Sequence, residues 1–524
     1  LPSWEIEYDD DELLFNTGRD LDGNLPYSDG TFYSSYLLST DYYQKSYGTD
    51  GVGNHYYSMA GSGTYVHMGN YSSSSVGIHV VKFDINGTLV WGKVITSTNG
   101  CGSDGSSCTV EGIHITGEDS FFLISSHYNT GTMTYDANTS LSISGHQFAV
   151  AYHSTAGWEW AETKATDGSY AYTSPLDARL DGSNNLIVTM GQVSSGNYDP
   201  YSITHYTTLG GKWVRQLEIM QDNYAGEILV DIEQNNVHYF ILAYDSIRYD
   251  SQTISCPAGS FGNYCHIWLT INSNGIKTSS TAVKYSDVSM NSFEVVGNSA
   301  YLHGWSLESV HDKETNLTGT PQDCAGTHFC GVMVQLDTAG IWSNIQELDG
   351  YESYEDLIIF QNVYFNDDGS GYYRVLLQPS DGHSYDGQDL RLFAHKGLEM
   401  ILVGFDSSFG YEWHQNFGSD SADFFDFGVA ITDAGYIIVS ADGDEWAMNT
   451  NLHYNNTMLK FTAWVSSTNG SIFDLEADVY GTPIGTLPNG GLLLGNLAGG
   501  PQSGYKIKYY MPDHDNDNIG SDDN

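Results

Sequence analysis

The stretch HVVKFDINGTLVW (residues 79–91) decides the fold of this chain. Apolar and polar residues alternate on both sides of a polar turn that contains Gly87, and this pattern is typical of a β-hairpin. The pattern returns at residues 148–160, 202–213, 266–277, 331–342, 401–413 and 458–473. The corresponding turn glycines, about 64 residues apart, are Gly157, Gly210, Gly275, Gly340, Gly410 and Gly470. The sequence therefore consists of repeats of one hairpin-containing unit.

A second strand pair precedes each hairpin. Its second strand is an apolar run, found at residues 64–69, 121–126, 186–191, 239–244, 300–305, 373–378, 436–441 and 492–497. Each run follows a shorter strand, for example residues 112–116 or 427–432. A four-stranded unit cannot bury both faces alone, but repeated units can pack radially on one another. We therefore expect an all-β fold, a β-propeller of four-stranded antiparallel blades, with eight blades or alternatively seven.

The last unit lacks one strand. It contains three candidate strands, at residues 481–488, 492–497 and 504–511. A strand from the N-terminal part of the chain would complete the blade and remove its open edge. Residues 36–48 resemble the outer strands of the other units, so we expect them to close the ring. The predicted division is an N-terminal arm at 1–35, the β-propeller at 36–511 and an acidic tail at 512–524.

The charge balance excludes several classes of partner. The chain has 18 Lys and Arg against 65 Asp and Glu, a formal net charge of −47. A nucleic-acid-binding protein needs a basic face, so we expect no nucleic-acid partner. Anionic membrane surfaces are disfavoured for the same reason, and no apolar run is long enough for a transmembrane segment. Cations are the natural counterpart of this chain.

The six cysteines form three close pairs. No Cys-x-x-Cys knuckle is present, which disfavours a zinc site, although free thiols or a metal site remain the alternative. We expect three local disulfides: Cys101–Cys108, Cys256–Cys265 and Cys324–Cys330. Disulfides indicate an oxidising setting, so the expected location is extracellular or at the cell surface.

Six sequons make the chain a candidate glycoprotein. They lie at Asn70, Asn86, Asn138, Asn316, Asn455 and Asn469. With so many Asn, Ser and Thr residues, chance predicts about this number, so the sequons permit glycosylation without arguing for it.

The acidic tail DHDNDNIGSDDN (513–524) has the pattern of a calcium loop. Asp513, Asp515 and Asp517 follow the alternating spacing of oxygen ligands, and Ile519 would add a backbone carbonyl, with Asp522 as a further acid. We predict Ca²⁺ as the cofactor; the alternative is a solvated acidic tail.

A second candidate cage lies in RDLDGNLPYSDG (19–30). It would use the oxygens of Asp20, Asp22 and Asn24, and a solvated turn is the alternative.

The hairpin VVKFDINGTLVW, together with GTYVHMGNYSSS (63–74), resembles the SBBP-type bacterial β-propeller repeat. This resemblance covers about residues 36–511 and implies a secreted or surface propeller without a fixed enzymatic activity. The hairpin is also similar to the tryptophan-docking repeat of quinoproteins, but this chain has no vicinal cysteine pair. The acidic tail resembles a thrombospondin type-3 repeat, from which it departs at Asn518 and Ser521.

Tryptophans recur after the hairpin turns. They are Trp91, Trp160, Trp213, Trp342 and Trp413. Packing between neighbouring blades is the expected role, and stacking on sugars is the alternative.

No HExxH, GxSxG or GKS/T motif is present in the sequence, and the one GxGxxG, at residues 100–105, lies in a cysteine-bracketed loop with no helix after it. We therefore expect a non-enzymatic extracellular structural or adhesive propeller. It would self-associate in a calcium-dependent way, as a homopolymer in a surface filament or cell-surface layer. A carbohydrate-binding propeller and a polysaccharide-active propeller enzyme are the alternatives.

Overall fold

The fold is taken from a computed structural model of the whole chain. The structure describes residues 5–8, 14–15, 44–61, 66–68, 71–73, 75–84, 88–99, 101, 108–144, 147–164, 175–191, 198–220, 228–233, 235–257, 264–284, 288–306, 330–339, 341–348, 359–366, 368–377, 384–385, 388–390, 399–419, 425–431, 436–442, 446–448, 460–477, 482–486, 492–497 and 505–510.

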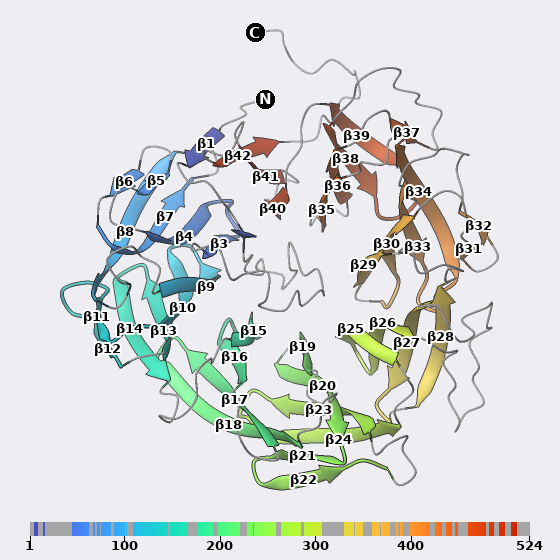
Figure 1. The fold of residues 1–524 in the computed structure, drawn as a ribbon, viewed down its shortest axis with the longest axis horizontal. Coiled ribbons are helices and arrows are strands. Elements are labelled where there is room, and N and C mark those ends of the chain that lie inside the picture. Colours follow the sequence, from blue (N-terminus) through green and yellow to red (C-terminus); the bar gives the residue numbers. More distant parts are fainter. Residues whose placement is uncertain are drawn as a thin grey trace.

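These residues form eight sheets with a core of four antiparallel strands each, and the sheets follow one another around a ring (Figure 1). The chain is therefore a β-propeller, and the described strands give eight blades rather than seven. Within each blade the first strand lies nearest the ring centre and the fourth lies outermost (Figure 1).

The first four blades take their strands in chain order. Blade 1 is β3 (Gln44–Thr49), β4 (His55–Gly61), β7 (Gly77–Phe83) and β8 (Leu89–Thr98). Blade 2 is β9 (Cys108–Gly117), β10 (Ser120–His127), β13 (Gln147–Ser154) and β14 (Gly157–Lys164). Blade 3 is β15 (Pro175–Leu180), β16 (Leu186–Gly191), β17 (Tyr198–Thr207) and β18 (Gly210–Met220). Blade 4 is β19 (Ile228–Glu233), β20 (Asn236–Tyr244), β23 (Tyr264–Asn272) and β24 (Lys277–Lys284).

The last four blades continue the series. Blade 5 is β25 (Val288–Val296), β26 (Ser299–Ser306), β27 (Cys330–Asp337) and β28 (Trp342–Leu348). Blade 6 is β29 (Ile359–Phe365), β30 (Gly371–Leu377), β33 (Glu399–Phe405) and β34 (Tyr411–Ser419). Blade 7 is β35 (Phe425–Ile431), β36 (Tyr436–Asp442), β38 (Lys460–Ser466) and β39 (Ile472–Ala477). Blade 8 is β40 (Thr482–Thr486), β41 (Leu492–Leu497), β42 (Tyr505–Tyr510) and β1 (Glu5–Tyr8).

The middle strands are buried on both faces because each blade is packed between two others. In β10, Phe121 belongs to the apolar cluster shared with blade 1, whereas its neighbour Phe122 belongs to the cluster shared with blade 3. This split follows from the two-residue period of a strand. A continuous apolar run in the second strand thus supplies two interblade cores at once.

The position of the closing strand corrects one expectation. An N-terminal strand does complete blade 8, but it is β1, which pairs antiparallel with β42 from Glu5 opposite Lys508 to Tyr8 opposite Tyr505. Residues 44–48 of the expected segment 36–48 instead belong to β3, the innermost strand of blade 1. The short β2 (Leu14–Phe15) runs parallel to β3. The closing strand therefore lies inside the segment expected to be an arm.

The second strand of blade 1 is a further correction. It is β4, whereas the expected stretch 64–69 contributes β5 (Val66–Met68) to blade 8. Residues 55–61 and residues 64–69 both have a sequence pattern compatible with a strand. The choice is settled by the seven-residue pairing of β4 with β7, a nonlocal contact that no local pattern encodes.

Extra strands fasten neighbouring blades at four places in the described chain. Each comes from the loop between the second and third strands of one blade and pairs with the outer strand of the preceding blade; we call these segments straps. The straps are β5 on β1, β11 (Gly131–Thr134) on β8, β21 (Ser246–Tyr249) on β18 and β37 (Trp446–Met448) on β34. Three are widened by β6 (Tyr71–Ser73), β12 (Ser140–Ile143) and β22 (Gln252–Ser255). A separate hairpin joins β31 (Ser384–Tyr385) to β32 (Gln388–Asp389).

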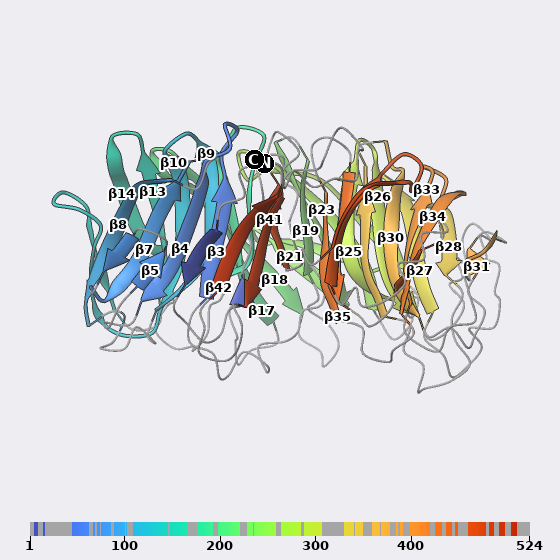
Figure 2. The same cartoon turned by 90° about the horizontal axis from the view of Figure 1, so that it is seen from above.

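The two ends of the ring differ in their connections, and Figure 2 shows the strands running between these ends. Hairpin turns between the first and second strands, and between the third and fourth, lie at one end, which we call the turn face. Straps and connections between blades leave from the opposite end. No helix in the described part of the chain is long and apolar enough to span a membrane.

Candidate functional site

A group of charged side chains surrounds Asp119, in the turn between β9 and β10. Its Oδ1 accepts a hydrogen bond from Lys82 Nζ at 2.8 Å and another from Trp91 Nε1 at 2.9 Å. Both donors come from blade 1, and the Lys82 side chain is almost completely buried. Burial alone would raise the pKa of Asp119, but the bonds from Lys82 and Trp91 hold it below its usual range. Asp119 is therefore an anion that joins blade 1 to blade 2.

A histidine and a second lysine lie against the same turn. His153 Nδ1 is 2.9 Å from the backbone oxygen of Asp119, so this nitrogen carries the proton and donates it. Its Nε2 then has a free lone pair, which accepts a hydrogen bond from Lys93 Nζ at 2.5 Å. Burial lowers the pKa of His153 to about 4 and also lowers the pKa of Lys93. The imidazole is thus neutral near pH 7 and bridges Lys93 to the turn.

The backbone of Asp119 extends this network into blade 1. Its N–H donates to Tyr56 Oη at 2.9 Å, and the Tyr56 hydroxyl donates in turn to Asp50 Oδ2 at 2.9 Å. Burial raises the pKa of Tyr56, so the phenol remains a donor. Asp50 also accepts the backbone N–H groups of Val52 and Asn54. Every polar atom followed along this path links two blades or shapes a turn.

Buried acids repeat this arrangement in the next blades. Asp181 Oδ2 is 3.0 Å from His205 Nε2, and both side chains are fully buried. Asp231 connects three blades, because its Oδ1 accepts from Arg179 of blade 3 at 2.9 Å and its Oδ2 accepts the N–H of Val295 of blade 5 at 2.7 Å. The Asp181–His205 bond stabilises blade 3 internally, whereas Asp231 holds blades 3, 4 and 5 in register.

The expected packing between blades is confirmed for Trp91, Trp160, Trp213 and Trp413, whereas the side chain of Trp342 lies outside the described residues. Trp213 Nε1 donates to the carbonyl oxygen of Ser273, in the turn of the next blade, at 2.9 Å. A Cβ on Gly275 of that turn would lie 2.8 Å from the Trp213 ring, and Gly275 has φ +71°. The turn glycine is thus required both by the backbone conformation and by the tryptophan. The same bond joins Trp160 to Thr208 (2.9 Å) and Trp413 to Ser467 (3.2 Å).

Thr281 and Asn344 donate to the next turn at the two interfaces between these. Thr281 Oγ1 of blade 4 donates to the carbonyl of Thr338 at 3.0 Å, and Asn344 Nδ2 of blade 5 donates to the carbonyl of Ser408. Five successive interfaces, from blade 2 to blade 7, therefore share one device, a side-chain donor placed on the next turn. The sequence pattern showed the tryptophans but not their acceptors, because the acceptors are backbone atoms.

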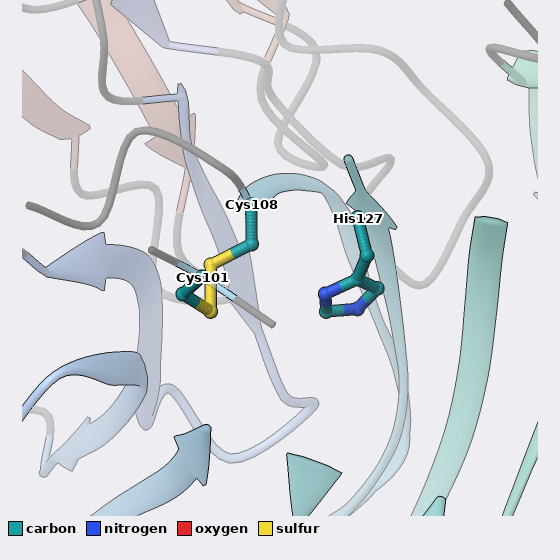
Figure 3. Close-up of side chains that lie close together, drawn as sticks. All are labelled: Cys101, Cys108 and His127. Carbon is teal, nitrogen blue, oxygen red and sulfur yellow. A yellow bond between two sulfur atoms is a disulfide. The ribbon is translucent and has the colours of Figure 1, made fainter. Parts of the chain in front are cut away.

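Figure 3 shows a third feature, the Cys101–Cys108 disulfide with the ring of His127 beside it. The ligand atoms of these three buried residues all lie within 4.8 Å of one another. Metal binding by cysteine needs thiolates, and both sulfurs are committed to the S–S bond. His127 Nε2 is 2.8 Å from Ser125 Oγ, and burial lowers its pKa to about 4. The group therefore has the residue types of a soft-metal site, but with the disulfide formed it has no thiolate to bind a metal.

Both described disulfides stand at joints between blades. Cys101 follows the last strand of blade 1, and Cys108 begins the first strand of blade 2. Cys256 follows the strap strand β22 and is bonded to Cys265, which lies in β23. These two pairings match the sequence prediction. Cys324 and the side chain of Cys330 lie outside the described residues, so the third disulfide stays a prediction.

The expected calcium ligands cannot be placed. Residues 20–24 and 513–522, which contain all of them, lie outside the described residues. Two sequon asparagines, Asn138 and Asn469, are described, and both are exposed in turns. The remaining sequons, at Asn70, Asn86, Asn316 and Asn455, also lie outside the described residues.

Sequence comparison adds no closer relationship: no protein-family model matches the chain, and no curated protein matches it. Among solved structures, BamB from Moraxella catarrhalis is similar at 11% identity with a TM-score of 0.35, covering 86% of this chain and 95% of that one. A GH43 β-1,3-galactosidase is similar at 8% identity with a TM-score of 0.23, covering 88% of this chain and 86% of that one. Likenesses this distant say nothing of activity. The strand pairing of the chain itself defines a β-propeller.

Proposed function

We propose that this protein is a non-enzymatic extracellular β-propeller that works by associating with further copies of itself, with calcium as the counter-ion. The observation that carries the proposal is the use made of buried ionisable groups. Asp119 and Asp231, with their lysine and arginine partners, bridge blades and so maintain a closed ring. Ionisable side chains that are used to bond neighbouring blades support a structural role for the protein.

The location follows from three supports. Two disulfides are compatible with a secreted protein. Both described sequons are exposed and open to glycan attachment. The resemblance of the hairpins to SBBP-type repeats points in the same direction.

The role proposed for calcium follows from the negative charge of the chain. Copies that each carry a net charge of −47 repel one another until cations neutralise part of it. Asp513, Asp515 and Asp517 provide oxygen ligands at the alternating spacing of a calcium loop. Calcium held there would contribute free energy that is available only when copies associate.

The test is light scattering together with electron microscopy of the whole chain, in calcium and in chelator. We expect wild-type assemblies that disappear in chelator, and a triple variant, Asp513→Ala/Asp515→Ala/Asp517→Ala, that no longer responds to calcium. The matched control is His514→Ala/Asn516→Ala/Asn518→Ala, which changes the intervening residues and spares the carboxylates. Failure of the wild type to associate in any condition would overturn the proposal. Turnover of a polysaccharide, or tight glycan binding, would favour the enzymatic or carbohydrate-binding alternative.

A further inference from the structure

The joint between blades 1 and 2 brings two sulfur atoms and an imidazole together in the core. Cys108 lies directly opposite His127 in the pairing of β9 with β10, and the disulfide places Cys101 beside them. Both cysteines are 0% exposed and His127 is 1% exposed. The three ligand atoms lie within 4.8 Å of one another, and the described residues hold no second group of three His, Cys, Asp or Glu that is as close.

One ring nitrogen of His127 has no hydrogen-bond partner among the described residues. Nε2 lies 2.8 Å from Ser125 Oγ, whereas the buried Nδ1 is unpartnered there. A buried N–H without an acceptor costs about 1–3 kcal/mol, so the favoured tautomer carries its proton on Nε2 and donates it to Ser125. Nδ1 then keeps its lone pair, and Figure 3 shows a ring nitrogen turned toward the disulfide. The imidazole is therefore in the form that binds metals.

Reduction of the disulfide would supply the other two ligands. A dithiol donates two electrons and two protons to the Sγ–Sγ bond, becomes a disulfide itself and leaves two thiols on the protein. Binding of Zn²⁺ then forms two Zn–S bonds and one Zn–N bond, and it releases the two thiol protons to solvent. Two thiolates and a neutral imidazole cancel the charge of a divalent cation, as a buried site requires.

The distances between the three side chains suit such a site. Bonds of about 2.3 Å to sulfur and about 2.0 Å to nitrogen place tetrahedral zinc ligands about 3.6–3.8 Å apart. Side-chain rotations are sufficient to reach this separation, because the three ligand atoms already lie within 4.8 Å of one another. Ser125 would orient the imidazole through Nε2, as the outer partner of a metal-bound histidine does.

We propose that Cys101, Cys108 and His127 form a thiol-dependent site for a thiophilic cation such as Zn²⁺. The metal replaces the disulfide as the covalent link at the joint between blades 1 and 2, and it adds β10 to that link through His127. Oxidation of the two thiols to the disulfide releases the cation, so the two links are mutually exclusive. This inference does not depend on the proposed self-association.

The experiment compares two forms of the whole chain, each with one cysteine pair, after reduction and anaerobic removal of the dithiol. In the described residues no histidine or carboxylate completes a group of three ligand atoms with Cys256 and Cys265, so this pair serves as the matched control. The test form is Cys256→Ser/Cys265→Ser/Cys324→Ser/Cys330→Ser, and the control form is Cys101→Ser/Cys108→Ser/Cys324→Ser/Cys330→Ser. Zn²⁺ is titrated against a chromophoric chelator, and Co²⁺ serves as a spectroscopic probe of thiolate ligation.

The test form should bind one equivalent of Zn²⁺ and show a thiolate-to-Co²⁺ charge-transfer band. Reoxidation should abolish both signals, because the disulfide has no thiolate. The control form should bind Zn²⁺ at least about tenfold more weakly, since it lacks the histidine ligand. Equal affinity of the two forms, or a Cys101–Cys108 pair that stays oxidised in excess dithiol, would overturn the site.

Two further variants of the test form examine the histidine. Ser125→Ala removes the partner of Nε2 and should weaken Zn²⁺ binding by about tenfold, the usual cost of losing such an outer partner. His127→Ala removes a ligand and should cost at least as much, with the number of titratable thiols unchanged. Near-ultraviolet circular dichroism checks the fold of each variant. Folded variants that both bind Zn²⁺ as tightly as the test form would show that His127 is not a ligand and would overturn the proposal.

Discussion

Reversing the charges on the closing strand β1 should weaken its pairing with β42 in blade 8. The register sets Glu5 opposite Lys508 and Glu7 opposite Lys506. A cross-strand pair of opposite charge contributes about 0.2–1 kcal/mol, and a like-charged pair destabilises by a similar amount. Glu5→Lys/Glu7→Lys converts two favourable pairs into two unfavourable ones, so the pairing of β1 with β42 should weaken by about 1–4 kcal/mol.

The assay is hydrogen–deuterium exchange of the peptide that covers β42. A loss of this size corresponds to local opening that is at least about fivefold more frequent, and exchange should accelerate by the same factor. The peptide covering β24, on the other side of the ring, serves as the internal control. Combining the double variant with Lys506→Glu/Lys508→Glu restores opposite charges and should restore slow exchange.

Two results would refute this reasoning. Unchanged exchange of β42 in the double variant, with intact protein by mass, would show that β1 does not close blade 8. Failure of the four-residue swap to restore protection would show that the register is wrong.

Three further predictions concern the blades themselves. Trp213→Phe keeps a ring but removes the bond to Ser273, so the free energy of unfolding in urea should fall by about 1 kcal/mol; equal stability would show that the bond contributes nothing. Gly275→Ala puts a Cβ 2.8 Å from the Trp213 ring at φ +71°, so stability should fall by about 1–3 kcal/mol, whereas Gly117→Ala, which meets nothing within 4 Å, should change little in the same assay. Acid should also destabilise the ring, because burial lowers the pKa of several histidines to about 3 or 4, among them His127, His266 and His303. Their unfolded pKa is about 6.5, so the unfolded chain binds more protons below that value; stability is fully present above pH 6.5 and falls toward pH 4, by about 2 kcal/mol per histidine at pH 5. A urea midpoint that is the same at pH 7 and pH 5 would contradict this account.

The hairpin repeat could be predicted because its determinants are local. Each third and fourth strand flanks a short polar turn, and a glycine such as Gly157, Gly210, Gly275 or Gly470 takes a positive φ there. The two-residue alternation and the turn residue lie within one stretch of chain, so a single sequence displays both. The number of blades followed from counting the apolar runs of the second strands, which number eight, rather than the hairpins, which number seven.

The closing strand was placed wrongly because pairing between chain ends is nonlocal. Residues 36–48 looked like an outer strand by composition, yet the structure uses Glu5–Tyr8. A signal was present: EIEY at 5–8 and YKIKYY at 505–510 alternate with opposite charges, and the latter segment holds two of only 18 basic residues. A search for distant candidate strands with complementary charge patterns would have found this pair.

The network around Asp119 could not be read from the sequence for a different reason. Lys82, Asp119 and His153 lie in three separate strands or turns, and only radial packing of blades 1 and 2 brings them together. Their types resemble a catalytic set, so the structure was needed to show that each atom is engaged between blades. The tryptophans were different, since their period predicted an interface before any partner was known.

The central claim is that copies of an eight-bladed ring associate in calcium. Electron microscopy of the wild-type chain, with class averages taken in calcium, tests it most directly. The account predicts eight-bladed rings joined to other rings in calcium and fewer such assemblies in chelator. Single separated rings at every protein and calcium concentration would contradict it.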